Sequence, residues 1–219
     1  MMKYLEIHGL EDGKATFNCG TRYDWYLIEK DALSNLSSPL LTKVKDEKGV
    51  TTLIDMTKFN WFPNSNVTEI SNLIANSPED SLESLMVYSP SAYEHRKWWM
   101  SHTMDEEKGF IHPCVHSTPK TGTRYMYSKV NNNGHFGVKK VIFGEAGIDS
   151  AIFDKDGTYG CTNGTFGIIV ENDADGEALV ALKDNKVFKK MLKDSLCWSS
   201  FRVDWNMFKH FKKGFWECF

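Results

Sequence analysis

The sequence predicts an α+β fold with a mixed, mostly antiparallel sheet and a few helices, and three observations support this. Short strand-like segments are separated by turn signals such as the one at residues 154–157. Segments with helical spacing are few. Glycines recur in pairs three residues apart, for example Gly134 with Gly137 and Gly144 with Gly147. This spacing indicates tight turns in an irregular sheet and does not match a phosphate-binding G-x-G-x-x-G loop.

The beginning of the chain is expected to form short strands. Residues 4–8 and 15–19 are candidate strands on either side of a turn at residues 11–13, and residues 51–56 are a third candidate. Residues 43–49 are rich in charge and are interpreted as a connector.

Two helices are predicted next. Apolar residues within 67–74 have the spacing of an amphipathic helix, with Asn66 as its cap and Glu69 as the third-position partner of a capping box. A second helix is expected over residues 91–99, where Glu94 completes a similar box.

The second half is expected to be mainly strands followed by helices. The candidate strands are residues 110–116, 123–130, 138–143, 149–154 and 165–170. Apolar spacing predicts a helix from about 175 to 193 with a lysine-rich outer face, and a short helix over 205–211. Aromatic residues crowd the C-terminal end and are expected to be mostly core: Trp198, Phe201, Trp205, Phe208, Phe211, Phe215 and Trp216. Trp98 and Trp99 are interpreted in the same way, as core residues, and any of these aromatics that is exposed would indicate a docking surface for a partner.

The charge distribution divides the chain into two parts, 1–109 and 110–219. The chain has 219 residues with 41% hydrophobic content, which suits one large globular domain or two modest ones. Residues 1–109 hold 11 Lys and Arg against 17 Asp and Glu, a net charge of −6. Residues 110–219 hold 15 against 12, a net charge of +3. The acidic first part is expected to dock a partner or to support the second part.

Composition also indicates a reducing compartment. The chain has no run of about 18 apolar residues and no signal-peptide pattern at its start, so we expect a cytoplasmic protein. Its five cysteines have no C-x-x-C pair and are interpreted as mostly buried hydrophobic residues. His112, Cys114 and His116 alternate along one predicted strand, and zinc would need a fourth ligand such as Cys161. A structural or DNA-facing strand is the favoured interpretation of this segment, and no metal site is assigned.

A stretch without acidic residues is the strongest indication of function. Residues 110–144 contain no Asp or Glu, and they include these cations: Lys120, Arg124, Lys129, Lys139 and Lys140. Aromatic and amide side chains lie among them: Tyr125, Tyr127, Asn131, Asn132 and Asn133. Cations neutralise DNA phosphates and amides bond to base edges, so the stretch is expected to contact nucleic acid.

Sequence patterns of the common DNA-modifying enzymes are missing. There is no G-x-G, no G-K-[ST] and no Pro-Pro, so we expect no adenosylmethionine site of the usual kind and no catalytic residues in this chain. Residues 106–108, with Asp80 upstream, resemble the carboxylates and lysine of a metal-dependent nuclease only loosely.

Several ordered blocks resemble a known family. The blocks are residues 110–120, 124–128, 131–144, 154–160, 197–205 and 211–213, with weaker matches at 61–64 and 91–94. They resemble the C-terminal target-recognition region of adenine-specific DNA methyltransferases of restriction-modification systems, including versions carried by large viruses. The catalytic domain that precedes this region in the family is missing here, and residues 1–59 match nothing in it.

The resemblance implies a sequence-reading module that is not catalytic alone. Its partners would be double-stranded DNA and a methyltransferase or restriction subunit, which would bind the adenosylmethionine. Lys120, Arg124, Lys129 and Lys140 are expected along phosphates, with Arg124 or Lys129 within reach of a guanine edge. The candidates for direct contacts to bases are Asn132, Asn133 and His135. The other expected DNA-contact residues are Tyr125, Tyr127, Asn131 and Lys139. Arg202 is assigned either to a phosphate or to a structural ion pair.

Two other functions remain open from the sequence. One is a small magnesium-dependent restriction endonuclease that uses Glu106 and Lys108. The other is a protein-interaction or inhibitor module that acts on a methyltransferase through the acidic part.

Overall fold

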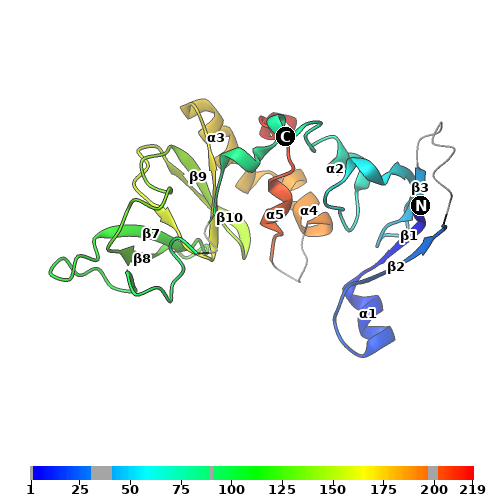
Figure 1. Cartoon of the computed structure of the whole chain (residues 1–219), viewed down its shortest axis with the longest axis horizontal. Helices are drawn as coiled ribbons and strands as arrows, with labels where there is room; N and C mark the ends of the chain where they lie inside the picture. The colour runs from blue at the N-terminus through cyan, green and yellow to red at the C-terminus, as the bar shows by residue number, and fades with distance from the viewer. Residues whose placement is uncertain (1, 31–40, 89–90, 197–201) are drawn as a thin grey trace.

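Three four-stranded sheets and five short α-helices make up the described part of the chain, which is residues 2–30, 41–88, 91–196 and 202–219 of a computed structural model (Figure 1). This confirms the predicted α+β class with mostly antiparallel strands. The expected core residues Trp198 and Phe201 lie outside the described residues, as does Cys197.

The first sheet, here called the N-terminal sheet, has the strand order β2-β1-β3-β4. Its strands are β1 (Met2–His8), β2 (Tyr23–Ile28), β3 (Leu41–Lys45) and β4 (Thr51–Asp55). Side chains alternate between its faces, so Leu5, Ile7, Val44 and Ile54 form one buried cluster. β1 and β3 are parallel, and the other neighbours in this sheet are antiparallel.

The central sheet has the order β10-β9-β12-β5. Its strands are β10 (Gly147–Asp154), β9 (Lys140–Gly144), β12 (Thr165–Ile169) and β5 (Met86–Tyr88). The main core lies against it and collects the C-terminal aromatic residues, including Phe208, Phe211, Phe215 and Trp216. Their predicted burial is confirmed.

The third sheet, here called the hairpin sheet, has the order β11-β7-β8-β6. Its strands are β11 (Gly160–Cys161), β7 (His112–Ser117), β8 (Arg124–Ser128) and β6 (Met100–Ser101). Figure 1 shows this sheet at the opposite end of the molecule from the N-terminal sheet, with helices α4 and α5 between them.

The helices are α1 (Leu10–Phe17), α2 (Val67–Ser71), α3 (Asp173–Ala181), α4 (Lys186–Ser195) and α5 (Trp205–Phe208). Short 3-10 turns lie at Met56–Lys58, Pro78–Asp80, Leu82–Leu85, Leu182–Asp184 and Phe215–Cys218. None of the helices in the described ranges is long and apolar enough to cross a membrane.

The expected boundary at residue 109 does not coincide with the sheets. β5 and β6 come from the first part of the chain, yet they pair with β12 and β8 of the second part. Helix α2 links the units, because Val67 contacts the core of the N-terminal sheet and Ile70 contacts the main core. The division by charge therefore does not predict the division by packing.

The predicted strand over 15–19 is wrong, because α1 occupies residues 10–17. The expected turn at 11–13 is the first helical turn, where Glu11 and Asp12 interact favourably with the helix dipole. A Cβ on Gly13 would lie 1.9 Å from the carbonyl oxygen of Thr21, so the missing side chain lets the helix pack against the chain that follows. The helix ends at Asn18 in the left-handed conformation, with φ 55°.

The helix predicted over 91–99 is also absent. The segment turns through the Lys97 N–H to Glu94 carbonyl bond (3.0 Å), and the Glu94 carboxylate bonds to Arg96 and caps no helix. Tyr93 is fully buried against the hairpin sheet, while the Trp99 indole donates to the Ala92 carbonyl. Packing of these two rings on the sheet overrides the helical pattern.

Two other helix predictions need correction. The helix expected from 175 to 193 is divided into α3 and α4 by the 3-10 turn Leu182–Asp184. Asn66 precedes α2 but forms no side-chain cap, because its amide donates to the Ser195 hydroxyl at 2.6 Å.

Candidate nucleic-acid interface

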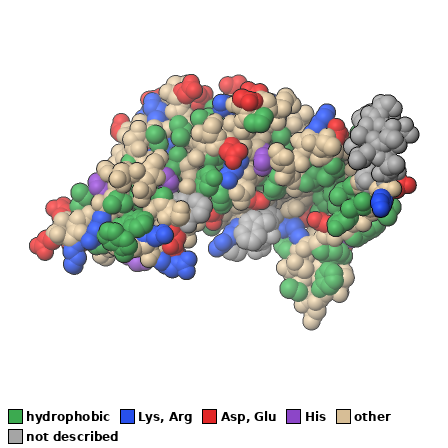
Figure 2. Space-filling model, viewed as in Figure 1, with side chains coloured by type: hydrophobic (Ala, Val, Ile, Leu, Met, Phe, Trp, Pro, Cys, Tyr) green, Lys and Arg blue, Asp and Glu red, His purple; other side chains and the backbone are tan. Residues whose placement is uncertain are grey.

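Most of the predicted contact residues lie along β8 and in the loops at its two ends, whereas Lys140 begins β9 and Arg202 lies near the C-terminal end. Arg124 begins β8, and Lys120 lies in the β7–β8 loop. Lys129 and the three asparagines follow the other end of the strand. Figure 2 shows Lys and Arg side chains along the lower edge of this end of the molecule, with exposed hydrophobic side chains among them.

Lys140 is not a surface residue, which corrects its assignment to a phosphate. Its side chain has no exposed surface, and its ammonium lies 2.5 Å from the Asp154 carboxylate. Asp154 also accepts hydrogen bonds from the N–H groups of Thr158 and Tyr159. A buried charge is stable only when it is paired in this way, so the lysine belongs to the folded core.

Two further lysines of the acid-free stretch have acidic partners from later in the chain. Lys139 lies 2.5 Å from Asp173, and Lys120 lies 3.4 Å from Asp149. The Lys120 side chain remains 75% exposed. Folding therefore neutralises part of the positive charge that the sequence suggested.

His135 and Tyr125 have packing roles that the sequence did not predict. His135 is buried, and its Nδ1 accepts the Cys161 N–H at 3.1 Å. Burial keeps the ring away from any base, and it is also the main cause that lowers the pKa of His135 to about 4. Tyr125 stacks on Tyr159 and packs against the buried Val115 cluster. Tyr127 is half-buried on the same strand.

Arg124 and Lys129 keep their charge at the surface. Both side chains are exposed, and neither forms an ion pair with any residue that the structure describes. The Lys129 ammonium lies 4.5 Å from the centre of the Phe110 ring, and its backbone N–H donates to the Trp99 carbonyl. Both cations are therefore exposed at the surface and available to an anionic ligand.

The three asparagines are exposed but not equivalent. The Asn133 N–H donates to the Tyr93 hydroxyl at 3.1 Å, and its amide contacts the Ala92 carbonyl at 3.5 Å. Within the described residues, the side chains of Asn131 and Asn132 make no hydrogen bond. Asn133 thus anchors the loop that presents the other two amides.

Arg202 is exposed near Glu145. Burial raises the pKa of Glu145, and the positive charge of Arg202 opposes that shift. The Val203 N–H donates to the Glu145 carbonyl at 3.0 Å, which holds the two residues together. Of the two roles open from the sequence, this geometry favours the ion pair.

Trp98 was not identified as a contact residue and was assigned to the core. It is 74% exposed, whereas Trp99 is half-buried beside it. The exposed guanidinium of Arg96 and the ammonium of Lys97 are its neighbours in the chain. The sequence signal that could have identified it is the run of cations from His95 to Lys97 directly before an aromatic pair.

The described residues contain no assembled metal site. No three His, Cys, Asp or Glu side chains lie close enough there to hold an ion. Burial raises the pKa of both Cys114 and Cys161 to about 12, so both thiols are protonated. Lys108 pairs with Asp105 in an exposed turn, and that turn does not join Asp80 to Glu106 in a metal-binding group.

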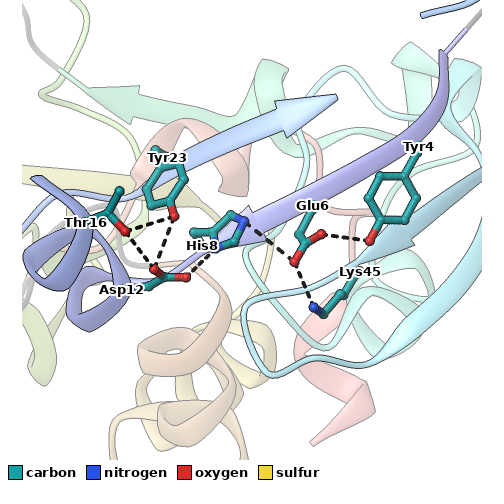
Figure 3. A network of polar contacts seen from close by, with 7 residues as sticks. All are labelled: Tyr4, Glu6, His8, Asp12, Thr16, Tyr23 and Lys45. Carbon is teal, nitrogen blue, oxygen red and sulfur yellow. Dashed lines mark hydrogen bonds and ion pairs between the residues drawn. The ribbon is translucent and has the colours of Figure 1, made fainter. Parts of the chain in front are cut away.

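A second polar cluster lies where the N-terminal sheet meets α1 (Figure 3). Glu6 accepts hydrogen bonds from Lys45 (2.7 Å) and Tyr4 (2.8 Å), and its pKa is lowered chiefly by the Lys45 bond. His8 Nδ1 forms a short hydrogen bond with Asp12, and this bond lowers the pKa of that carboxyl. His8 Nε2 is closed to solvent and lies 3.7 Å from Glu6. The cluster joins β1, β2, β3 and α1.

No family model, no curated protein and no solved structure matches this chain. The evidence for function is therefore the arrangement of the side chains on the hairpin sheet and the sequence blocks that cover it.

Proposed function

We propose that the hairpin sheet and its loops bind duplex DNA and read its sequence for an adenine-specific DNA methyltransferase or restriction-modification complex. The single observation that carries this proposal is the grouping of Arg124, Lys129 and Lys120 with the unbonded amides of Asn131 and Asn132 around one small strand, β8. Cations at the two ends of β8 suit contacts with successive phosphates, and the amides suit contacts with base edges.

Pairing of most nearby carboxylates supports the proposal. Two nearby carboxylates are already paired, Glu94 with Arg96 and Asp105 with Lys108. Glu106 and Glu107 lie in the turn before β7 and are the exposed acids closest in the sequence. Among the described residues, Arg124 and Lys129 therefore carry unpaired positive charge at the two ends of β8, as phosphate contacts require, while Glu106 and Glu107 lie apart from this strand in the turn before β7.

In this proposal the chain acts in the cytoplasm and is not catalytic alone. A partner subunit would bind adenosylmethionine and perform the methyl transfer, while this chain selects the site. The resemblance of residues 110–144 to target-recognition regions supports this division of roles.

The test is duplex binding as a function of salt. We expect binding to weaken between 50 and 200 mM salt (about 40-fold for three phosphate contacts). The double variant R124A/K129A should reduce the slope of log affinity against log salt by about 2. A matched control is K186A/K213A, which removes the same charge from exposed lysines outside the hairpin sheet.

An equal loss of affinity in both double variants would show that only net charge matters. Absence of duplex binding at 50 mM salt would overturn the proposal, and capture of a methyltransferase without DNA binding would favour the inhibitor function instead.

A further inference from the structure

Three histidines and an arginine meet beside the β7–β8 loop, on separate elements between residues 95 and 124. His116 is the next-to-last residue of β7, His102 follows β6, and His95 belongs to the turn that covers the sheet. The centres of the His95 and His102 rings each lie 6.4 Å from the centre of the His116 ring. Arg124 is close enough for its charge to act on His116.

The loop between β11 and β12 orients two of these rings. His116 Nδ1 lies 3.1 Å from the hydroxyl of Thr162, and His95 Nδ1 lies 3.0 Å from the side-chain oxygen of Asn163. Thr162 is fully buried, so its hydroxyl is a fixed partner. Each ring therefore keeps its Nε2 for another ligand.

The charges around the cluster favour an anion. The groups that face it are Arg124 from β8, His102 from the end of β6, and Glu94 with Arg96 from the covering turn. Glu94 is engaged by Arg96 at 2.6 Å and lies 3.5 Å from His95. The loop at Thr162 and Asn163 contributes no charge. Because Arg96 pairs with Glu94, Arg124 is the charge left to act with the three histidines on an anion.

A metal does not fit this arrangement. The described residues contain no group of three ligands for a metal. Burial first, and then the charges of His102, His95 and Arg124, lower the pKa of His116. An anion among these groups would reverse the repulsion and favour the charged rings.

We propose that His95, His102, His116 and Arg124 form a binding site for one backbone phosphate of duplex DNA, with the histidines protonated in the complex. The site rests on the proposed function and adds to it a specific anchor and a pH dependence. Because binding takes up protons, the affinity for duplex should increase as the pH falls from 8 to 6.

The experiment measures the affinity of the whole chain for a 20-base-pair duplex at fixed salt between pH 8 and pH 6. We expect about a tenfold gain for the wild type, which corresponds to a rise of one pKa unit in one histidine on binding. The variant H95Q/H102Q/H116Q should lose this gain and R124A should weaken binding at every pH, while H210Q, which changes a histidine outside the cluster, should keep the wild-type response.

Histidine side-chain NMR provides a second measurement for a variant that folds poorly. In the wild type, resonances of the three rings should shift on addition of duplex, and inorganic phosphate alone should shift the same rings more weakly. Duplex binding with an unchanged pH response in the triple variant, or with unshifted rings, would overturn the phosphate site and leave the proposed function intact. Absence of duplex binding would overturn both.

Discussion

The central sheet and the hairpin sheet both contain cations from the acid-free stretch, residues 110–144, but the burial and pairing of these cations differ between the two sheets. In the central sheet, Lys140 is fully buried and paired with Asp154. In the hairpin sheet, Arg124 and Lys129 remain exposed without a carboxylate partner among the described residues. The difference shows that distance from acids along the chain does not set the surface charge. In the folded protein, three of the five cations form ion pairs with acids from later in the chain, which are Asp149, Asp154 and Asp173.

The largest effect should come from breaking the buried pair. We expect K140A to lower the free energy of unfolding by about 3–5 kcal/mol, because Asp154 is left charged and buried without its partner. Denaturant unfolding measures this effect. K155A is the control, since Lys155 lies at the surface with exposed partners. Similar small losses in both variants would contradict the difference between the two environments.

The next effect concerns the buried histidine. The folded protein holds the pKa of His135 at about 4, below the ordinary 6.5, so the unfolded chain binds more protons between these pH values. Stability should therefore increase with pH across this window, and about 3 kcal/mol should be lost as the pH falls from 6.5 to 4.

The variant H135Q keeps an acceptor for the Cys161 N–H but cannot be protonated, so its stability should change less over this range. Unfolding curves at several pH values compare the two proteins, with H210Q as the control. Parallel curves for wild type and H135Q would show that His135 is not the responsible group.

A smaller effect should separate base contacts from structural contacts in the asparagine loop. N131A/N132A should reduce discrimination between DNA sequences by about 1–3 kcal/mol, because the amides are unbonded and available to base edges. Competition with mixed-sequence duplex measures discrimination. N133A should instead disturb the loop and weaken all duplexes alike. Equal discrimination in wild type and N131A/N132A would exclude these two residues from base recognition.

The smallest effect should come from a cation that is exposed but already paired. K120A should weaken duplex binding less than K129A, because Asp149 neutralises part of the Lys120 charge in the free protein. Binding at 100 mM salt compares the single variants, and D149N provides the converse change, with an expected gain in affinity. A larger loss for K120A than for K129A would place the main contact at the β7–β8 loop.

Much of the second half could be predicted because its signals are local. Strands β7, β8, β9, β10 and β12 lie within a few residues of their predicted positions, since short strand-like segments there end at glycine turns. The strands missed in the first half are β2, β3 and the very short β5 and β6. Residues 23–28 of β2 are largely exposed and lack alternation, and β3 is charged on its solvent face, so neither has a strong local pattern.

The candidate site was predictable in part for the same reason. The sequence identified Arg124, Lys129, Asn131 and Asn132, which the structure leaves exposed. It did not identify the exposure of Trp98, because an aromatic residue in a predicted helix is ordinarily core. It also could not bring together His95, His102 and His116, which lie on three separate elements.

The sequence by itself determined the fold class, most strands of the second half and the acid-free stretch, because periodicity, turn residues and composition are local properties. Only the tertiary structure decided which of those cations remain at the surface. Burial and pairing depend on residues that are distant in the chain, such as Asp154 beside Lys140 and Thr162 beside His116. Charge is carried by the residue, but whether it can attract DNA depends on the neighbours that folding supplies.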